Sequence, residues 1–236
     1  LFHKAAKLES VRNAFAYTSL EEVDEDFFAH NPELSNVTVC FSNTKLKTVP
    51  EKLFAKNPKI DDFSSVFTGI LTLETIPENI FANQPECDSF YYTFQGSGLK
   101  SIPSKLFANN KKCTDFRSTF NATKITSIPA ELFAGCSKVT TFMTCFSGCS
   151  ELQSIPGALF SNTGAFDTVT TTAFNNIFKG CTSLTEIPAG LFDGFTKVTQ
   201  FSASFSGCTS LAKLPSDLFA TNTNVTSFAN AFQDCS

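Results

Sequence analysis

The sequence predicts an α/β solenoid, in which short parallel strands and short helical or 3₁₀ segments stack coil upon coil. A pattern, L-x-x-I-P-x-x-L-F-x5-V-x-x-F-x3-F-x-x-C, recurs along the chain at steps of mostly 26 or 27 residues. The chain also has 28 Phe but no Trp and only 3 Tyr, as expected where one kind of apolar slot is filled many times. Because a single unit of this size cannot bury its own apolar face, neighbouring units must cover each other.

The repeats divide the chain into coils. They begin at Leu20, Leu46, Leu73, Leu99, Ile125, Leu152, Leu184 and Leu211, and residues 1–19 form a partial repeat before them. We therefore expect about eight coils in a single solenoid domain over residues 1–236. One step is 32 residues long, which indicates an insertion within residues 161–174. Because both ends of the chain cut through or beside a repeat, we expect it to be part of a longer protein.

Each repeat contains segments with different local preferences. The L-x-x-I-P and V-T-x-F-x-x-x-F segments are rich in β-branched and aromatic residues, which predicts short strands. The P-x-x-L-F segment is expected to form one or two helical turns, because Pro suits the first turn of a helix. The F-x-x-C segment is expected to form a tight turn or a short 3₁₀ segment.

Three columns of Phe are expected to fill the core. The first column is Phe2, Phe28, Phe54, Phe81, Phe107, Phe133, Phe160, Phe192 and Phe219. The second is Phe63, Phe90, Phe116, Phe142, Phe174, Phe201 and Phe228. The third is Phe15, Phe41, Phe67, Phe94, Phe120, Phe146, Phe178, Phe205 and Phe232. These columns account for most of the Phe in the chain.

The position after the first Leu of the repeat carries alternating charges in four successive coils. The residues are Glu21, Lys47, Glu74 and Lys100. In-register parallel stacking would place opposite charges beside each other, which is favourable for neighbouring strands. We therefore expect these four side chains to form one row on one face. The alternative is four unrelated surface charges.

Composition argues against several classes of protein. The net charge is −4 and charged residues make up 17% of the chain, so no nucleic-acid partner is expected. No apolar run approaches the ~18 residues of a membrane helix, so no membrane span is expected within this chain.

The nine Cys are expected to be buried thiols that serve packing. One slot holds Cys149, Cys181, Cys208 and Cys235, and in other repeats Thr44, Ile70, Ser97 and Thr123. A slot that accepts these types is a small packing position, whereas Cys136 is expected in a loop. Disulfides between neighbouring coils and metal binding are the alternatives. Because the chain has no C-x-x-C motif, we expect neither a metal site nor a cofactor.

The sequence offers no catalytic machinery. His3 lies in the partial repeat and His30 in a loop, and each is expected to be an exposed histidine. There is no Gly-rich phosphate loop and no carboxylate pair in a distinctive setting. We therefore expect the chain not to be an enzyme.

Binding would involve the outward positions that vary between repeats. The residue after the second-column Phe is expected to point outward, because side chains alternate along a strand. Three successive coils carry Tyr91, Arg117 and Met143 there, with Tyr92 beside them. Since Tyr and Arg are enriched in binding hot spots, these four residues are the candidate partner-binding site. The alternative is an ordinary solvated face.

Several segments resemble bacterial BspA-like leucine-rich repeats, whose pattern is similar to VTxIGxxAFxxCxxLxxIxIP. The matching segments are "VTTFMTCFSGCSELQSIP" (139–156), "VTQFSASFSGCTSLAKLP" (198–215) and "VTSFANAFQDC" (225–235). Phe201 and Phe228 occupy the Ile slot of that pattern. The resemblance covers the whole chain, which departs from the family in its longer P-x-x-L-F-x5 linker.

The resemblance implies an exported protein at the cell surface, as an outer-membrane lipoprotein or a secreted protein, notably of Bacteroidales. Some eukaryotic mucosal parasites carry similar repeats. It implies a non-enzymatic interaction or adhesion module that binds a protein or glycan, for example of the host extracellular matrix or cell surface. The alternatives are a structural spacer that binds nothing, and an accessory domain of a larger surface protein or enzyme.

Overall fold

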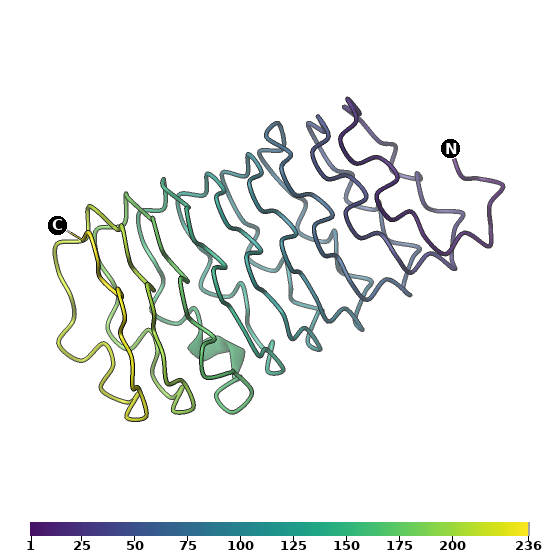
Figure 1. The fold of residues 1–236 in the computed structure, drawn as a ribbon. Helices are drawn as coiled ribbons and strands as arrows, with labels where there is room; N and C mark the ends of the chain where they lie inside the picture. Colours follow the sequence, from purple (N-terminus) through teal and green to yellow (C-terminus); the bar gives the residue numbers. More distant parts are fainter. Residues whose placement is uncertain (236) are drawn as a thin grey trace.

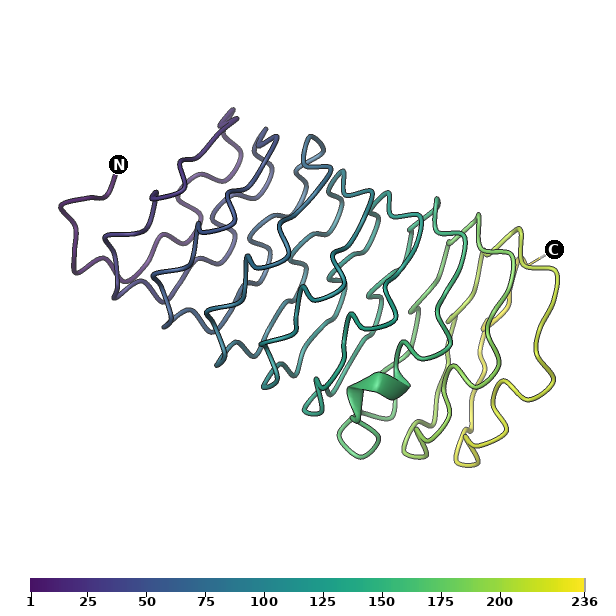
Figure 2. The ribbon, with the colours of Figure 1, turned by 180° about the vertical axis from the view of Figure 1, so that it is seen from behind.

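The chain winds into an elongated stack of coils. The computed structural model describes residues 1–235, and the two ends of the chain lie at opposite ends of the stack (Figure 1). The view from behind shows the same row of coils, with a small helix projecting at its lower edge (Figure 2). This helix is η1, a 3₁₀ helix over Ser161–Thr163.

Isolated β-bridges, and not continuous β-strands, join the coils of the described residues. Within residues 1–235, η1 is the only helix. The parallel bridges are Ser10–Asn36, Asn36–Asp62, Asp62–Ser89, Ser89–Asp115, Asp115–Thr141, Glu186–Lys213 and Gln200–Ser227. The P-x-x-L-F segment forms turns where helical turns were expected: the Leu53 N–H donates to the Pro50 carbonyl at 3.2 Å, and the Ala55 N–H to the Lys52 carbonyl at 3.0 Å. The solenoid is therefore as predicted, but its α/β detail differs.

Two left-handed residues in each coil explain why no extended strand forms. In one coil these are Ser65 (φ 57°) and Gly69 (φ 70°), and the same four-residue spacing recurs in the others. They turn the backbone immediately after the bridge. The N–H groups of Phe63, Ser65, Phe67 and Gly69 nevertheless all donate to carbonyls of the next coil, at 2.7–3.0 Å. Hydrogen bonding between coils thus continues along a segment that is not extended.

The Phe columns form the core, as predicted. Apart from the end coils, their rings are fully buried. Neighbouring rings of a column lie nearly parallel: Phe120 and Phe146 have centroids 5.6 Å apart and planes at 4°. Only at the end of the stack does a column ring become exposed, as Phe228 does at 43%. The core is therefore a continuous stack of aromatic rings.

The 32-residue coil accommodates its extra residues without disturbing the Phe stack. Helix η1 ends at Thr163, and its C-cap Gly164 turns the chain with a left-handed φ of 68°. Phe166 follows and packs against Phe195 of the next coil, with ring centroids 5.1 Å apart. Phe146 and Phe178, which flank the insertion, remain 5.6 Å apart. The insertion therefore leaves the spacing of the stack unchanged.

A row of buried amides lies beside the first Phe column. The Asn57 side-chain NH₂ donates to the carbonyls of Phe28 (3.1 Å) and Asn31 (2.7 Å) in the preceding coil. Equivalent pairs of bonds are made by Asn31, Gln84, Asn110 and Asn222. We call this row the amide ladder. These carbonyls also accept a backbone N–H of their own coil, so the amide ladder adds a second hydrogen bond that links each coil to the preceding one.

The predicted row of alternating charges is confirmed in two pairs. Lys47 lies 2.6 Å from Glu21, and Lys100 lies 2.7 Å from Glu74, with all four side chains exposed. In the described part of the chain no ion pair joins Lys47 to Glu74. The continuity of the row between the two pairs therefore stays a prediction.

Candidate functional site

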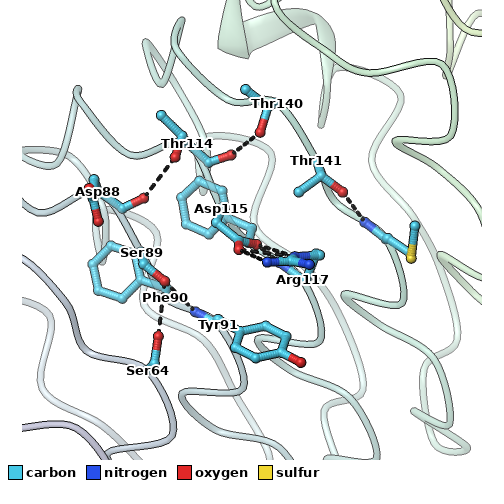
Figure 3. Close-up of polar contacts among 12 residues, drawn as sticks. Ser64, Asp88, Ser89, Phe90, Tyr91, Thr114, Asp115, Arg117, Thr140 and Thr141 are labelled. Atoms are coloured by element: carbon cyan, nitrogen blue, oxygen red, sulfur yellow. Dashed lines mark hydrogen bonds and ion pairs between the residues drawn. The ribbon is translucent and has the colours of Figure 1, made fainter.

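A repeated turn positions the outward side chains. The residue before the second-column Phe is small and polar in most coils, and its side chain accepts the N–H two residues later. The bonds run from Tyr91 N–H to Ser89 Oγ (3.3 Å), from Arg117 N–H to Asp115 Oδ1 (2.8 Å) and from Met143 N–H to Thr141 Oγ1 (3.2 Å) (Figure 3). Sequence analysis did not identify this polar position, although Ser, Asn, Asp and Thr recur there.

The structure brings three of the four candidate binding residues together. The rings of Tyr91 and Tyr92 have centroids 4.0 Å apart. The guanidinium carbon of Arg117 lies 4.7 Å from the Tyr91 ring centroid, and Figure 3 shows these two side chains together. A guanidinium at this distance from an aromatic face is a favourable cation–π contact. The three side chains therefore form one surface cluster across two coils.

Asp115 holds the Arg117 side chain in place. Arg117 Nε donates to both carboxylate oxygens, at 3.1 and 3.0 Å, and Nη2 donates to Oδ2 at 2.6 Å. This hydrogen bonding raises the pKa of Arg117. The pKa of Tyr91 is also raised, first by its side-chain hydrogen bond with Tyr92 and then by burial. The cluster thus presents a guanidinium oriented by Asp115 beside two tyrosine rings.

Met143, the fourth candidate residue, lies on the next coil. Its carbonyl accepts the Ser118 N–H at 3.1 Å, and its side chain is half-buried. Tyr92 is placed by a left-handed backbone with φ 57°, and its N–H donates to the Arg117 carbonyl at 3.1 Å. We call Tyr91, Tyr92, Arg117 and Met143 the aromatic patch.

Carboxylates border the aromatic patch. Asp115 lies beside it, next to Arg117, and Asp88 lies farther away, on the other side of Ser89 and Phe90 (Figure 3). The pKa of Asp88 is raised, first by burial and then by repulsion from Asp61, Asp62 and Asp115. Because such repulsion requires the charges to be close, the surface next to the aromatic patch is acidic.

The cysteines have the packing role that the sequence predicts. All nine are free thiols. The Cys149 S–H donates to the Phe120 carbonyl of the preceding coil at 3.1 Å, and burial raises its pKa to about 11. Cys136 lies outside any helix or strand, as expected, and is fully buried, because it occupies the slot that Asn or Gln fills in the amide ladder. Thiols with raised pKa values are poor nucleophiles and metal ligands at neutral pH.

The two histidines are exposed, as expected, but they are not isolated. The rings of His3 and His30 have centroids 4.8 Å apart. Sequence analysis treated them separately because one lies in the partial repeat and the other in a loop. Their meeting follows from the stacking of the first two coils.

The sequence predicts no membrane-spanning segment in this chain. Among residues 1–235 there is no helix with the length and hydropathy that crossing a bilayer requires.

The stacked coils, parallel bridges and buried repeat positions define a leucine-rich-repeat protein. A family model for the BspA type leucine rich repeat region matches residues 1–114, 70–185 and 100–236. The chain therefore belongs to the BspA-type leucine-rich repeats. Repeats of this kind are generally interaction scaffolds without enzymatic activity.

Solved structures share the fold. A chain of the Toll–Spatzle complex, described as a hub in Drosophila development and innate immunity, aligns with a TM-score of 0.66 at 22% identity, over 99% of this chain and 27% of that one. The leucine-rich repeat domain of the type III effector XopL aligns with a TM-score of 0.63 at 15% identity, over 95% of this chain and 69% of that one. No curated protein matches the sequence. At these identities the likeness concerns the fold alone.

Proposed function

We propose that this chain is a non-enzymatic interaction or adhesion module of an exported bacterial cell-surface protein, either an outer-membrane lipoprotein or a secreted protein. It binds a protein or glycan partner, of the host matrix or of a neighbouring cell, through the aromatic patch. The chain forms one solenoid domain. The observation that carries the proposal is the Tyr91–Tyr92–Arg117 cluster.

The cluster supports binding because the fold does not require it. The same outward position holds Thr38, Ser64, Asn175 and Ser202 in other coils, and their backbone hydrogen bonding to neighbouring coils is the same. Two rigid rings and an oriented guanidinium offer contact area at a low cost in side-chain entropy. Such a cluster on a repeat surface is typical of a recognition site.

The surrounding charge indicates the kind of partner. The carboxylates that border the aromatic patch, with a net charge of −4 for the chain, disfavour polyanions such as nucleic acids. They favour a protein surface with basic groups, or a neutral glycan whose sugar rings stack on the tyrosines. Binding to a basic protein should weaken as salt rises, because exposed charges are screened.

A panel of immobilised matrix proteins and a glycan array test the proposal. The probe is the purified chain, and the test variant is Tyr91→Ala/Tyr92→Ala/Arg117→Ala. Loss of the central residues of a binding site typically costs more than about 1 kcal/mol each, so we expect affinity to fall by about tenfold or more. Biolayer interferometry measures the change.

Arg12→Ala/Tyr17→Ala is the matched control. Arg12 occupies the same outward position in the first coil, and Tyr17 is 80% exposed at a left-handed backbone position like that of Tyr92. We expect this variant to bind like the wild type. If both variants lost affinity equally, the aromatic patch would not be the specific binding site, and another part of the solenoid would bind the partner.

The structural spacer makes the opposite prediction. A spacer or accessory domain shows no saturable binding to any protein or glycan of the panel. That result for the folded wild-type chain would contradict the proposal.

A further inference from the structure

Three potential metal ligands meet where the first two coils stack. His3 follows Phe2, and His30 lies two residues after Phe28. The Phe2 and Phe28 rings stack at 6.1 Å with planes at 10°, which brings the two histidines onto the same edge of the solenoid. Asp26 lies beside them, so that one ligand atom from each residue falls within 4.8 Å of the other two.

This cluster departs from the repeat pattern. The residue after the first-column Phe is Ala29, Ala55, Ala82, Ala108, Ala134 and Ala220 in other coils. The third coil holds Lys52 and Lys56 where the second holds Asp26 and His30. His3 and His30 are also the chain's two histidines. Packing therefore does not account for the cluster, because neighbouring coils stack equally well without it.

We propose that His3, His30 and Asp26 bind a divalent transition-metal ion of the zinc class. Imidazole nitrogen is a preferred ligand of Zn²⁺, Co²⁺, Ni²⁺ and Cu²⁺, whereas Mg²⁺ and Ca²⁺ prefer sites made entirely of oxygen. Two imidazoles and a carboxylate supply three of the four positions around Zn²⁺, and solvent supplies the fourth.

The geometry needs only small side-chain movements to close around an ion. Ligands about 2.0–2.1 Å from Zn²⁺ in a tetrahedron lie about 3.3 Å from each other. The three ligand atoms are already within 4.8 Å, and all three side chains are exposed and free to rotate. Rotation about the side-chain bonds is therefore enough, with no change in the backbone.

The bound ion would fasten the first coil to the second. Phe2 and Phe15 of the first coil are only partly buried. The side chain of Asn31 links the two coils here, donating to the carbonyls of Phe2 (3.1 Å) and Ala5 (2.8 Å). Because an ion that binds only the folded state stabilises it, a bound ion would strengthen the contact between these two coils.

Titration of the full chain with zinc chloride tests the site. We expect one Zn²⁺ per chain by calorimetry, and slower amide exchange over residues 1–19 when zinc is added. His3→Gln and His30→Gln should each weaken binding by about tenfold or more, since each removes one of three ligands. Asp26→Asn should weaken it too. Circular dichroism shows whether each variant is folded.

Two controls separate this site from other sources of binding. Asp24→Asn and Lys56→Gln change nearby exposed charges without removing a ligand, and both should bind zinc like the wild type. Cobalt chloride reports the ligand type: the proposed site gives visible d–d bands without the near-ultraviolet thiolate charge-transfer band. A thiolate band, undiminished affinity in both histidine variants, or no saturable binding up to millimolar zinc would each overturn the proposal.

Discussion

In residues 1–124 ion pairs join side chains of neighbouring coils, whereas in residues 125–235 the polar side-chain contacts between coils come mainly from hydroxyl and thiol groups. The inter-coil pairs of the first half are Glu21–Lys47, Glu25–Lys52, Glu33–Lys59, Glu74–Lys100 and Glu86–Lys112. Among the described residues of the second half, the one ion pair is Asp167–Lys197, with atoms 3.9 Å apart. Cys149, Cys181 and Cys208 there donate S–H bonds to the preceding coil.

The buried slot beside the first Phe column changes in the same way. The first half fills it with the amide ladder, whereas the second half has Cys136, Thr163 and Phe195 before an amide returns at Asn222. Cys136 Sγ lies 3.9 Å from the Asn110 carbonyl oxygen, a single long contact where an amide makes two shorter bonds. The second half therefore has fewer polar links between its coils.

The aromatic core is the same in both halves. Phe94 and Phe120 in the first half and Phe178 and Phe205 in the second have ring centroids 5.6 Å apart. The comparison indicates that the Phe columns set the spacing of the coils, because the polar contacts around the core differ between the two halves without changing that spacing. Outward positions are therefore free to acquire binding side chains such as those of the aromatic patch.

Removing a core ring should have the largest effect. Phe146→Ala deletes a fully buried ring and should lower the free energy of unfolding by about 3–5 kcal/mol. Phe228→Ala is the control, because that ring is 43% exposed and less area is lost. Urea denaturation measures both. Equal losses would contradict the claim that the interior stack holds the coils together.

Removing one amide of the ladder should have a smaller effect. Asn57→Ala leaves the carbonyls of Phe28 and Asn31 without this donor, and should cost about 1–3 kcal/mol. The matched change in the second half is Cys136→Ala, which should cost less because the thiol makes one long contact. Thermal unfolding followed by circular dichroism compares the two variants. A larger loss of stability for Cys136→Ala than for Asn57→Ala would contradict the expectation that the amide links neighbouring coils more strongly than the thiol does.

Relieving backbone strain should stabilise both halves. Val39 and Thr144 adopt φ 61°, a left-handed conformation that β-branched residues avoid. The same position holds Asn13 and Asn176 in other coils, and Asn tolerates this conformation. Val39→Asn and Thr144→Asn should each raise the free energy of unfolding by roughly 1 kcal/mol. A loss of stability in both variants would show that side-chain packing outweighs the backbone strain.

The smallest effect concerns one surface ion pair. The hydrogen bond and charge of Lys47 lower the pKa of the Glu21 carboxyl. In Lys47→Gln this pKa should rise towards its ordinary value, which an NMR titration of the Glu21 side chain detects. Because the folded pKa is lowered, the pair stabilises the fold above the ordinary pKa, and this contribution is lost as the pH falls through the lowered pKa. An unchanged Glu21 pKa would show that the pair does not persist in solution.

The sequence was sufficient to predict the architecture, because the repeat pattern records which positions are buried. It predicted the Phe columns, the insertion and the pairing of Glu21 with Lys47. It did not predict that the expected strands are turns, because residues as unlike as Val39, Ser65 and Tyr92 occupy the first left-handed position and leave no common signal there. The second left-handed position does carry a signal, since five coils have Gly there: Gly69, Gly96, Gly148, Gly180 and Gly207. Backbone conformation at the first position is set by stacking and not by local preference.

Other features could have been found in the sequence. Asn or Gln stands three residues after the first-column Phe in five repeats, which is the signal for the amide ladder. The small polar residue before the second-column Phe is the signal for the turn that orients Tyr91 and Arg117. The meeting of His3 and His30 was harder to predict, because they occupy different positions of the repeat.

The central claim is that surface ion pairs stabilise the contacts between coils mainly in the first half of the stack. Hydrogen exchange measured by mass spectrometry, at low salt and at about 1 M NaCl, tests this claim most directly. At about 1 M salt the screening length falls to about 3 Å, so exposed ion pairs lose most of their attraction. We expect amide exchange to become faster in residues 20–112 and to stay unchanged in residues 139–235. An equal response in both halves, or a larger response in the second, would contradict the account.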